Sequence, residues 1–348
     1  VMLCLPDIDF LVHTNEYYGI TPTQEVNLTA PVLVQAQVEG NHGILMPWWA
    51  FLQWDWTRRY RDRLEESSKD IQWEDRDDLL FWRGSDTGCL LSEILPPSRA
   101  KTVWMPCANW TQNTWPLFPR SKLVLASSFF PKRIDAVFTK DTVHLDCQDV
   151  YDATGLRVEE IVPPEAHVRH KYLAYVDGTS FSDRLFWLLL TDSLVFRAGS
   201  SIRVWLDAGL QAWTHYVPVH GNLSDLFDQL DWAKKNDAES ARMASEAARF
   251  AKSDLTLEAS LLYLYHLLSR LGNLIHLTPE EINAPAKMPK IQVEPLEESE
   301  LDCWALGFSF NLCCNVEQHG PGGNSACWDG PYSFELCCQG DSFGAKKL

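Results

Sequence analysis

One short segment of the chain combines an arginine, glycines and hydroxyl side chains directly after an apolar run. It reads Arg83-Gly84-Ser85-Asp86-Thr87-Gly88. Glycine lets backbone N–H groups approach a ligand, serine and threonine add hydroxyl groups, and arginine offers a planar fork that matches phosphate. The segment therefore indicates a phosphate-binding loop. An ordinary turn at the end of a strand is the alternative interpretation.

A second arginine, Arg184, follows Ser182 and Asp183 near the start of a predicted helix. A helix start beside an arginine favours anion binding. In the alternative interpretation, Arg184 pairs on the surface with Asp183 or Asp177. Either way, this segment is the second place in the chain where a phosphate group could be held.

A carboxylate suited to proton transfer is found nearer the N-terminus. Glu16 lies in a polar stretch after an apolar strand, and carboxylates at strand ends in α/β folds often face the ligand crevice. An ordinary exposed acid is the simpler interpretation from sequence alone. The Asp7-Ile8-Asp9 pair has metal-binding spacing, but it adjoins a strand and we interpret it as structural. The chain contains neither a P-loop nor a G-x-G-x-x-G motif.

Short apolar strands alternate with helices and place these segments at strand ends. The predicted strands are Ile8–Val12, Pro31–Gln37, Leu79–Trp82, Ser193–Phe196 and Tyr216–Val219. Three of the predicted helices are Asp183–Leu190, Ala238–Ala251 and Leu255–Leu271, the last ended by Gly272. A fourth is capped by Ser224 and has Leu226, Leu230 and Ala233 on its apolar face. This alternation predicts an α/β fold with mostly parallel sheets.

Composition excludes several classes of protein. The 348 residues are enough for two domains, and 46% apolar with 22% charged residues is typical of a globular chain. A formal charge of −17 argues against a nucleic-acid partner, which needs a basic footprint. The longest apolar run, Leu185–Leu190, is far shorter than the roughly 20 residues of a membrane-spanning helix.

The C-terminal region contains a duplicated unit. Cys303-Trp304 through Cys313-Cys314 matches Cys327-Trp328 through Cys337-Cys338 at seven of twelve positions. We expect residues 277–302 to be a linker and 303–340 to be two Cys-Trp repeats that act as an accessory interaction module. Disulfides explain the six cysteines better than zinc does, because no Cys-x2-Cys pair is present.

The clustered cysteines and three glycosylation sequons, at Asn27, Asn109 and Asn222, favour the secretory route. No signal peptide precedes them, and the chain begins with Val1 rather than methionine. We therefore expect a location in the lumen of the endoplasmic reticulum or Golgi, or secretion, with the signal or anchor segment outside this sequence.

Nine segments in order resemble a known family. They are Pro6–Phe10 with Glu16-Tyr17, Ile44–Pro47, Phe81–Ser85, Lys171–Leu173, Asp177–Arg184, Ser193–Phe196, His215–Val219, Asn222–Leu226 and Asn236-Asp237. Together they are similar to glycosyltransferase family 90, which includes capsule-associated xylosyltransferases and Rumi-like protein O-glucosyltransferases. The resemblance covers roughly residues 5 to 272.

The resemblance implies a GT-B-like α/β fold of two Rossmann-like halves. These would be residues 1–78, an incomplete half on the acceptor side, and residues 79–276, which bind the nucleotide sugar. The implied reaction is inverting transfer of glucose or xylose from a UDP-sugar to a hydroxyl group of a protein Ser or Thr or of a glycan. No cofactor and no metal are implied.

The resemblance also assigns roles to residues. Glu16 would be the catalytic base at a position where the family has Asp, and Arg83, Gly84, Ser85, Ser182 and Arg184 would bind the donor. Trp82, where the family usually has Phe, would be able to stack on the sugar or on uracil. The segment Ser200–Trp205 lacks a glutamate that the family normally carries. A non-catalytic nucleotide-sugar-binding or interaction protein is therefore the alternative function.

Overall fold

The computed structural model describes residues 8, 10–13, 31–38, 43–52, 57–87, 89–90, 103–104, 115–139, 157–178, 180–274, 314, 316 and 338. Glu16, Asn27 and Asn109 lie outside these residues. The chain forms two compact units, Val1–His276 and Leu277–Leu348. Within the described part of the chain, no helix combines the length and the apolar character needed to cross a membrane.

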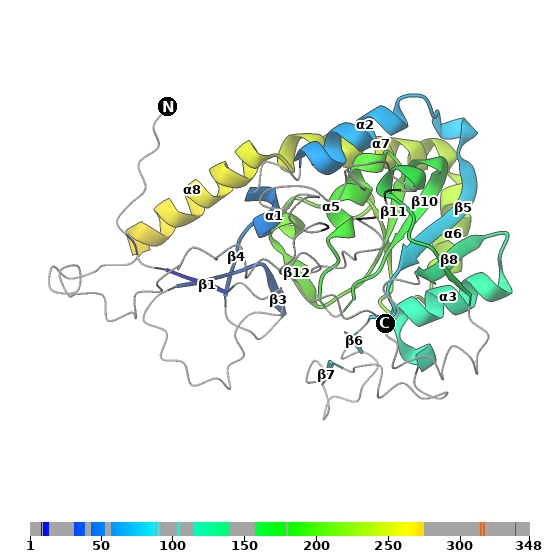
Figure 1. Cartoon of the computed structure of the whole chain (residues 1–348), viewed down its shortest axis with the longest axis horizontal. Coiled ribbons are helices and arrows are strands. Elements are labelled where there is room, and N and C mark those ends of the chain that lie inside the picture. Colours follow the sequence, from blue (N-terminus) through cyan, green and yellow to red (C-terminus); the bar gives the residue numbers. More distant parts are fainter. Residues whose placement is uncertain are drawn as a thin grey trace, which may run out of the picture. The chain divides into compact units, whose positions relative to one another are not determined.

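The first unit is built on a six-stranded sheet in which every neighbouring pair of strands is parallel (Figure 1). Its strands are β5 (Asp77–Gly84), β8 (Ile134–Thr139), β9 (Val158–Glu159), β10 (His170–Tyr175), β11 (Leu194–Ala198) and β13 (Val217–Val219). Their order across the sheet is β13-β11-β10-β5-β8-β9. The expected α/β fold with parallel sheets is confirmed.

The strand order reverses between β5 and β10. From β5 the chain adds β8 and β9 on one side, and then returns to add β10, β11 and β13 on the other. In a doubly wound sheet of this kind, ligands bind in the crevice outside the carboxyl ends of the strands at the reversal. The carboxyl ends of β5 and β10 therefore mark the position of a candidate site.

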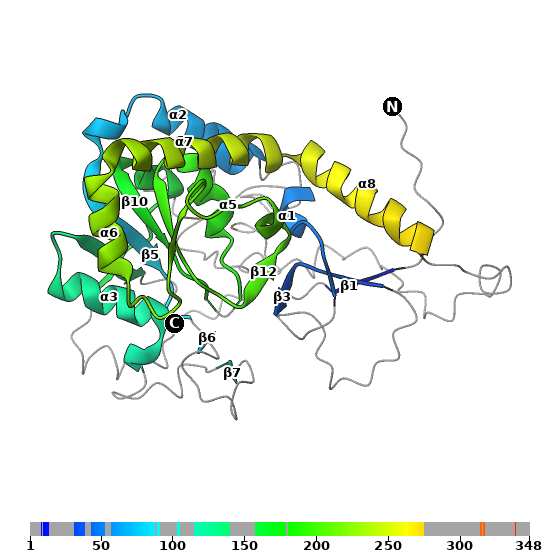
Figure 2. The same cartoon turned by 180° about the vertical axis from the view of Figure 1, so that it is seen from behind.

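Both faces of this sheet are buried, as parallel sheets require. Leu80 and Trp82 of β5 point to one face, together with Phe138 and Phe196 of neighbouring strands. Three helices cover this face: α3 (Pro119–Phe129), α6 (Leu226–Lys235) and the first half of α7 (Asp237–Asp254). Figure 2 shows α3 and α6 on the same side of the sheet.

The opposite face of the sheet carries Phe81, Leu173 and Val195. It is covered by α5 (Arg184–Leu188), which continues as a 3-10 helix over Leu189–Thr191, by α2 (Arg63–Ser68) and by the second half of α7. A π-helical turn (Thr57–Asp62) leads into α2, and shorter 3-10 helices span Trp73–Asp75, Trp115–Leu117, Pro164–Arg169 and Trp205–Ala208.

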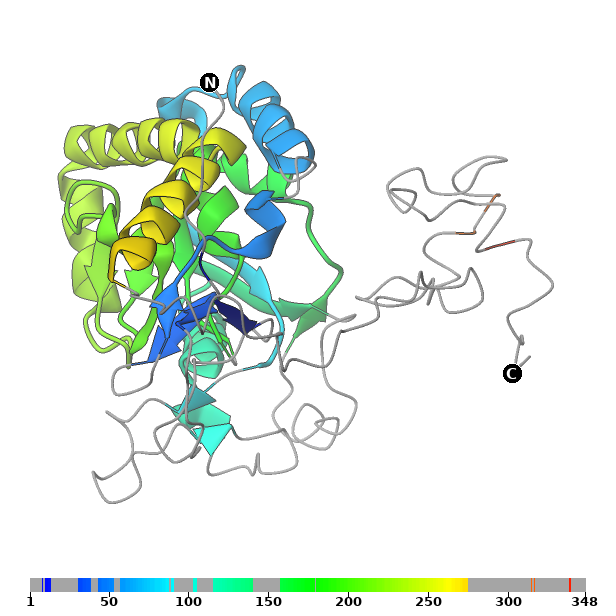
Figure 3. The same ribbon diagram turned by 90° about the vertical axis from the view of Figure 1, so that its left-hand side faces the viewer.

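The N-terminal elements form a smaller parallel sheet in the order β1-β2-β4. Its strands are β1 (Leu11–His13), β2 (Val32–Val34) and β4 (Ile44–Leu45), and α1 (Trp49–Leu52) follows them. Helix α8 (Leu257–Leu274) packs Leu264, Leu268 and Leu271 against Leu33 and Met46. In Figure 3, α8 is the yellow helix in front of the blue N-terminal elements.

A second connection between the early and late parts of the unit is antiparallel. Strand β3 (Ala36–Val38) pairs with β12 (Ile202–Val204), so that Val38 faces Ile202 and Ala36 faces Val204. A separate two-stranded pair joins β6 (Cys89–Leu90) to β7 (Val103–Trp104). The β3–β12 pair fixes the N-terminal elements beside the carboxyl end of β11.

Strands β8, β9 and β10 were not predicted from the sequence, and several local details also differ from the sequence-based expectations. The predicted strand Pro31–Gln37 divides into β2 and β3 at Gln35. Ser224 does not cap α6, because the N-cap position is Asp225. Gly272 does not end α8, which continues to Leu274. A single glycine lowers helix propensity by only about 1 kcal/mol, which the packing of α8 against the N-terminal sheet offsets.

Two segments that carry the family resemblance are joined by an ion pair at the amino edge of the sheet. Lys171 Nζ lies 2.9 Å from Asp237 Oδ1, and the indole N–H of Trp73 donates to the same oxygen at 3.0 Å. The Lys171 ammonium also lies 5.2 Å from the centre of the Trp73 ring. This cluster anchors the start of α7 to β10, far from the carboxyl ends of the strands.

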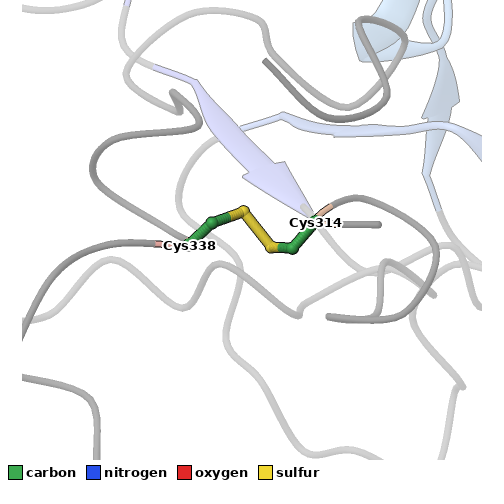
Figure 4. Close-up of a disulfide and its surroundings, with 2 residues drawn as sticks. All are labelled: Cys314 and Cys338. Atoms are coloured by element: carbon green, nitrogen blue, oxygen red, sulfur yellow. A yellow bond between two sulfur atoms is a disulfide. The ribbon is translucent and has the colours of Figure 1, made fainter. Parts of the chain in front are cut away.

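In the second unit, Cys314 and Cys338 form a disulfide (Figure 4). The two cysteines are 24 residues apart and occupy equivalent positions in the two Cys-Trp copies. The expectation of disulfides in this region is confirmed for this pair. The other repeat cysteines, Cys303, Cys313, Cys327 and Cys337, lie outside the described residues.

A buried histidine makes the stability of the first unit depend on pH. Burial lowers the pKa of His167 to about 3, and its Nδ1–H donates to the Pro163 carbonyl at 3.1 Å. The unfolded chain titrates near 6.5, so the neutral ring stabilises the fold fully above pH 6.5. We expect the free energy of unfolding to fall by about 1.4 kcal/mol per pH unit as the pH decreases from 6.5 toward 3.

Urea unfolding at pH 7.5, 5.5 and 4.5 measures this dependence in the wild type and in His167→Asn, whose amide can keep the bond to Pro163. Asparagine does not titrate, so the variant should lose less stability over the same range. Equal losses in both proteins would contradict the assignment to His167.

Candidate active site

The reversal point of the large sheet collects polar residues from several elements. Ser85 and Thr87 follow β5, Asp177 follows β10, Arg120 lies on α3 and Arg184 begins α5. Because the carboxyl ends of parallel strands meet at one edge of the sheet, these residues come together although they are far apart in sequence.

Arg120 connects the carboxyl ends of the two central strands. Its Nε and Nη2 donate to the Val176 carbonyl at 3.3 and 3.1 Å. Its Nη1 donates to the hydroxyl oxygens of Ser85 and Thr87, both at 2.8 Å. The Arg120 side chain is therefore a brace that holds the loop after β5 against the end of β10.

The loop hydroxyls keep one hydrogen for a ligand. Ser85 Oγ and Thr87 Oγ1 lie 2.9 Å apart, and either can be the donor in that bond. Arg120 donates to both oxygens, so the mutual bond uses only one of the two hydroxyl hydrogens. The other forms no bond with a described residue and can be donated to an acceptor, such as a phosphate oxygen, outside the loop.

Arg184 lies beside this brace and is not bonded in the same way. Its guanidinium forms no hydrogen bond or ion pair with any other residue in the described part of the chain, and its Nη1 is enclosed without a partner. Burial lowers the pKa of Arg184, although the Asp183 carboxylate opposes this shift, and burial together with the nearby Arg184 charge lowers the pKa of Arg120 to about 9. An enclosed cation without a bonded counter-ion is costly, so this place favours an anionic ligand.

Two glycines make room for the two guanidinium groups. A Cβ atom at Gly84 would lie 2.5 Å from Nη1 of Arg184, and one at Gly178 would lie 2.8 Å from Nη2 of Arg120. Both distances are shorter than real Cβ contacts. The glycine predicted as part of a phosphate-binding loop therefore serves here to admit a cationic side chain.

Trp82 lies beneath both arginines. Its side chain is only 2% exposed, and the Arg184 and Arg120 guanidinium carbons lie 5.5 and 5.8 Å from the ring centre. The expectation that Trp82 could stack on a sugar or on uracil is not met, because its ring is buried next to these guanidinium groups.

A hydrogen-bonded network shapes the segment before Arg184. The Tyr175 hydroxyl donates to Asp177 Oδ1, and the Ser182 N–H donates to the Tyr175 oxygen at 3.1 Å and to Asp177 at 3.3 Å. Burial raises the pKa of both Tyr175 and Asp177. Ser182 therefore contributes its backbone N–H to the turn that positions Arg184.

A cavity of about 230 Å3 opens next to this group, at the carboxyl ends of β11 and β13. It is lined by residues that include Arg197, Ser200, Arg203, Asp207 and Tyr216. Arg197 is neutralised by Asp207 at 2.6 Å. A smaller cavity, lined by Asp177, Gly178 and Ser200 among others, lies between the larger one and the arginines.

Arg83 is placed differently from the other predicted binding residues. Its Nη2 lies 2.9 Å from Asp135 Oδ2 and 2.9 Å from Glu159 Oε2. Arg157 binds the same two carboxylates at 3.2 and 3.0 Å, which closes a four-membered ring of alternating charges. The Arg83 charge is thus used within β5, β8 and β9, and the structure does not bring it to Arg184.

The structure groups four of the six predicted site residues: Gly84, Ser85, Ser182 and Arg184. Glu16 lies outside the described residues and Arg83 lies on the other face of β5. Sequence reasoning did not identify Arg120, because it lies within a helix without a local motif. Its one sequence signal is the Pro-Arg pair at a helix start. Across the described ranges, no group of three His, Cys, Asp or Glu side chains could hold a metal ion.

Comparison with known proteins gives a consistent result. The model of the family described as "Glycosyl transferase family 90" matches residues 1–304. Protein O-glucosyltransferase 2 of Danio rerio is 25% identical over 279 residues, which cover 78% of this chain and 48% of the relative. Human protein O-glucosyltransferase 1 is 24% identical over 280 residues, which cover 76% of this chain and 62% of the relative. The chain thus spans about half to three fifths of the length of these relatives.

Among solved structures, HepE of Anabaena in complex with UDP-glucose has a TM-score of 0.36 and 11% sequence identity. The match covers 60% of this chain and 53% of that chain. A likeness of this size carries no argument about the ligand of this chain.

The unpaired guanidinium predicts an anion site that can be tested directly. We expect Arg184→Met to weaken inorganic pyrophosphate binding about 10- to 100-fold, because a charge-assisted hydrogen bond contributes about 1.5–3 kcal/mol. Gly84→Ala should also weaken binding, since its methyl group displaces Arg184. Gly209→Ala is the matched control, because its Cβ would also meet a side chain, Phe250 at 2.9 Å, but Gly209 does not line either cavity. Calorimetric titration that finds equal affinity in Arg184→Met and wild type would contradict the site.

The ring of four charges predicts a different result for Arg83. Arg83→Met leaves Asp135 and Glu159 with only Arg157, so we expect a loss of about 2 kcal/mol in stability, less than for a fully buried pair. Pyrophosphate affinity should stay unchanged. Arg242→Met removes an exposed pair with Glu239 and should cost under about 0.5 kcal/mol. A loss of pyrophosphate binding in stable Arg83→Met protein would show that Arg83 does bind the anion.

Proposed function

Because the chain belongs to glycosyl transferase family 90, we propose that it transfers a sugar from a UDP-sugar to a hydroxyl group, with inversion at the sugar carbon. The proposed sugar is glucose or xylose, and the proposed acceptor is a Ser or Thr of a protein or a hydroxyl of a glycan. The names of the relatives, protein O-glucosyltransferases, support glucose and a protein acceptor.

The observation that carries this proposal is the Arg184 guanidinium at the reversal point of the sheet, whose Nη1 is buried without a partner among the described residues. When the bond between the sugar and the diphosphate breaks, negative charge grows on the leaving oxygen. A fixed cation at that place stabilises the transition state more than the ground state. In the proposed complex, Arg184 lies against the diphosphate, and the loop of Ser85 and Thr87 donates a hydroxyl hydrogen to it.

The neighbouring cavity supports a nucleotide as the leaving group. It begins beside Ser200 at the end of β11 and extends along Arg197 and Tyr216, next to the diphosphate position. We assign the nucleoside half of the donor to this cavity. The smaller cavity beside Asp177 lies between the two places, and we propose that one ligand spans both.

Transfer with inversion needs a base that takes the proton from the acceptor hydroxyl while the diphosphate leaves from the opposite side. We propose Glu16 for this role. A glutamate in place of the aspartate of the family moves the carboxylate by about one ångström, and a misplacement of this size can cost about 100-fold in rate. The proposed reaction uses no metal ion or cofactor, because Arg184 supplies the charge for the leaving group.

The disulfide between Cys314 and Cys338 supports an oxidising compartment. We propose the lumen of the secretory pathway, or secretion, as the location of the protein. The Cys-Trp repeats are proposed to be an accessory interaction module that is not required for sugar transfer.

Donor turnover tests the proposed reaction. The full chain is incubated with UDP-glucose and with UDP-xylose, and release of UDP is measured for wild type, Glu16→Gln and Arg184→Met. We expect turnover in the wild type, and losses of 100-fold or more, on the order of a removed base or charge stabiliser, in both variants.

The outcomes separate the alternatives. Binding of UDP without turnover in the wild type would support the non-catalytic binding protein instead of the enzyme. Turnover that survives in Glu16→Gln would exclude Glu16 as the base and leave the enzyme intact. Turnover that survives in Arg184→Met would exclude the proposed position of the diphosphate.

A further inference from the structure

Trp82 and Gly84 lie two residues apart on β5, so both positions face the same side of the strand. Trp82 fills its position with an indole ring, which packs edge-on against Phe138 at 5.9 Å between ring centres. Gly84 leaves its position empty. A Cβ atom there would lie 2.6 Å from Cζ2 of Trp82 and 2.5 Å from Nη1 of Arg184. The glycine thus opens a slot beside the indole, and the Arg184 guanidinium occupies it.

The two arginines at this slot repel each other. The charge of Arg184 contributes to lowering the pKa of Arg120. Arg120 is held by hydrogen bonds to Val176, Ser85 and Thr87, whereas Arg184 has no such bond to a described residue. Repulsion and loss of hydration would both drive Arg184 out toward solvent. The Asp183 carboxylate attracts the Arg184 charge, but it accepts no hydrogen bond from the guanidinium in the described part of the chain. A contact that fixes the position of the guanidinium is therefore still needed before a ligand binds.

The indole supplies that attraction. The Arg184 guanidinium carbon lies 5.5 Å from the Trp82 ring centre, and that of Arg120 lies 5.8 Å from it. Both are within the roughly 6 Å over which a ring attracts a cation, and tryptophan gives the strongest attraction of the aromatic side chains. Unlike a carboxylate, the ring attracts the cation without neutralising it. The ring therefore leaves the N–H donors of Arg184 available to an incoming anion.

We propose that Trp82 is a positioning residue that holds the unpaired Arg184 guanidinium in the slot above Gly84, ready for the diphosphate of the donor. This inference rests on the proposed function, in which Arg184 binds the diphosphate. Trp82 itself does not contact the ligand. Trp82 therefore strengthens the binding of the diphosphate and leaves the binding of the nucleoside unchanged.

Three ligands separate these parts: UDP, inorganic pyrophosphate and uridine. Their affinities are measured on the full chain, by calorimetry for the two anions and by ligand-observed NMR for uridine. We expect Trp82→Leu to weaken UDP and pyrophosphate binding about 3- to 30-fold, the range for one cation–π contact. Uridine affinity should stay within about twofold of wild type. Trp82→Phe keeps an aromatic ring, so its affinity for UDP and pyrophosphate should lie between those of the wild type and Trp82→Leu.

Trp73→Leu is the matched control. Trp73 also carries a cation over its ring, Lys171 at 5.2 Å, but at the amino edge of the sheet. Its loss should lower the melting temperature and leave the affinity for all three ligands unchanged. If Trp82→Leu does not fold, Trp82→Phe decides the matter, with weaker UDP binding and equal uridine binding expected.

Each remaining outcome overturns either the role of Trp82 or the proposed function, or both. Wild-type UDP affinity in folded Trp82→Leu or Trp82→Phe overturns the role of Trp82 and leaves the proposed function standing. Equal loss of UDP and uridine affinity overturns it as well, because the damage is then general. A wild type that binds pyrophosphate but not UDP overturns the nucleotide-sugar function, and the pyrophosphate series still tests Trp82. A wild type that binds neither anion overturns both.

Discussion

The division of roles between two neighbouring arginines is the constraint on which the candidate site depends. Arg120 uses its donors inside the protein, on the Val176 carbonyl and on the hydroxyls of Ser85 and Thr87, and thereby joins the ends of two strands. Arg184, which forms no hydrogen bond with another described residue, lies beside that frame. If Arg120 were free as well, neither guanidinium would have a fixed position, and an anion would have to order both when it binds.

The α/β class was predictable from the sequence, because apolar runs of four to six residues between helical segments are typical of buried parallel strands. Three strands of the large sheet, β8, β9 and β10, were not among the predicted strands. The strand order was not predictable, since it depends on contacts between distant segments. One boundary error explains the different placement of Arg83. The predicted strand ended at Trp82, whereas β5 continues to Gly84. Inside a strand, successive side chains alternate between faces. Arg83 therefore points to Asp135 and Glu159, while Trp82 and Gly84 face the arginines.

The segments that resemble the family contribute to the protein in two ways. Those at the carboxyl ends of strands, such as the one containing Ser182 and Arg184, form the candidate site. Those at the amino ends hold the scaffold, as the Lys171–Asp237 ion pair does. Sequence alone does not separate the two groups, because lysine, aspartate and tryptophan are equally plausible in both. The direction of the strand decides whether a segment lies at the candidate site or in the scaffold. Arg120, which is central to the site, lies outside all the segments that resemble the family.

The pairing of β3 with β12 has a consequence for how the protein is made. Strand β3 emerges from the ribosome roughly 160 residues before its partner, Ile202–Val204. Helix α8, which covers Leu33 and Met46, is made later still. At about 5–20 residues per second, β3 waits roughly 8 to 33 seconds for β12. Strand β2 has its strand partners β1 and β4 close by in sequence, and only its contact with α8 forms late. Early strands that lack partners are prone to pair with other chains. The edge of β3 is therefore a place where a chaperone during synthesis would prevent such pairing.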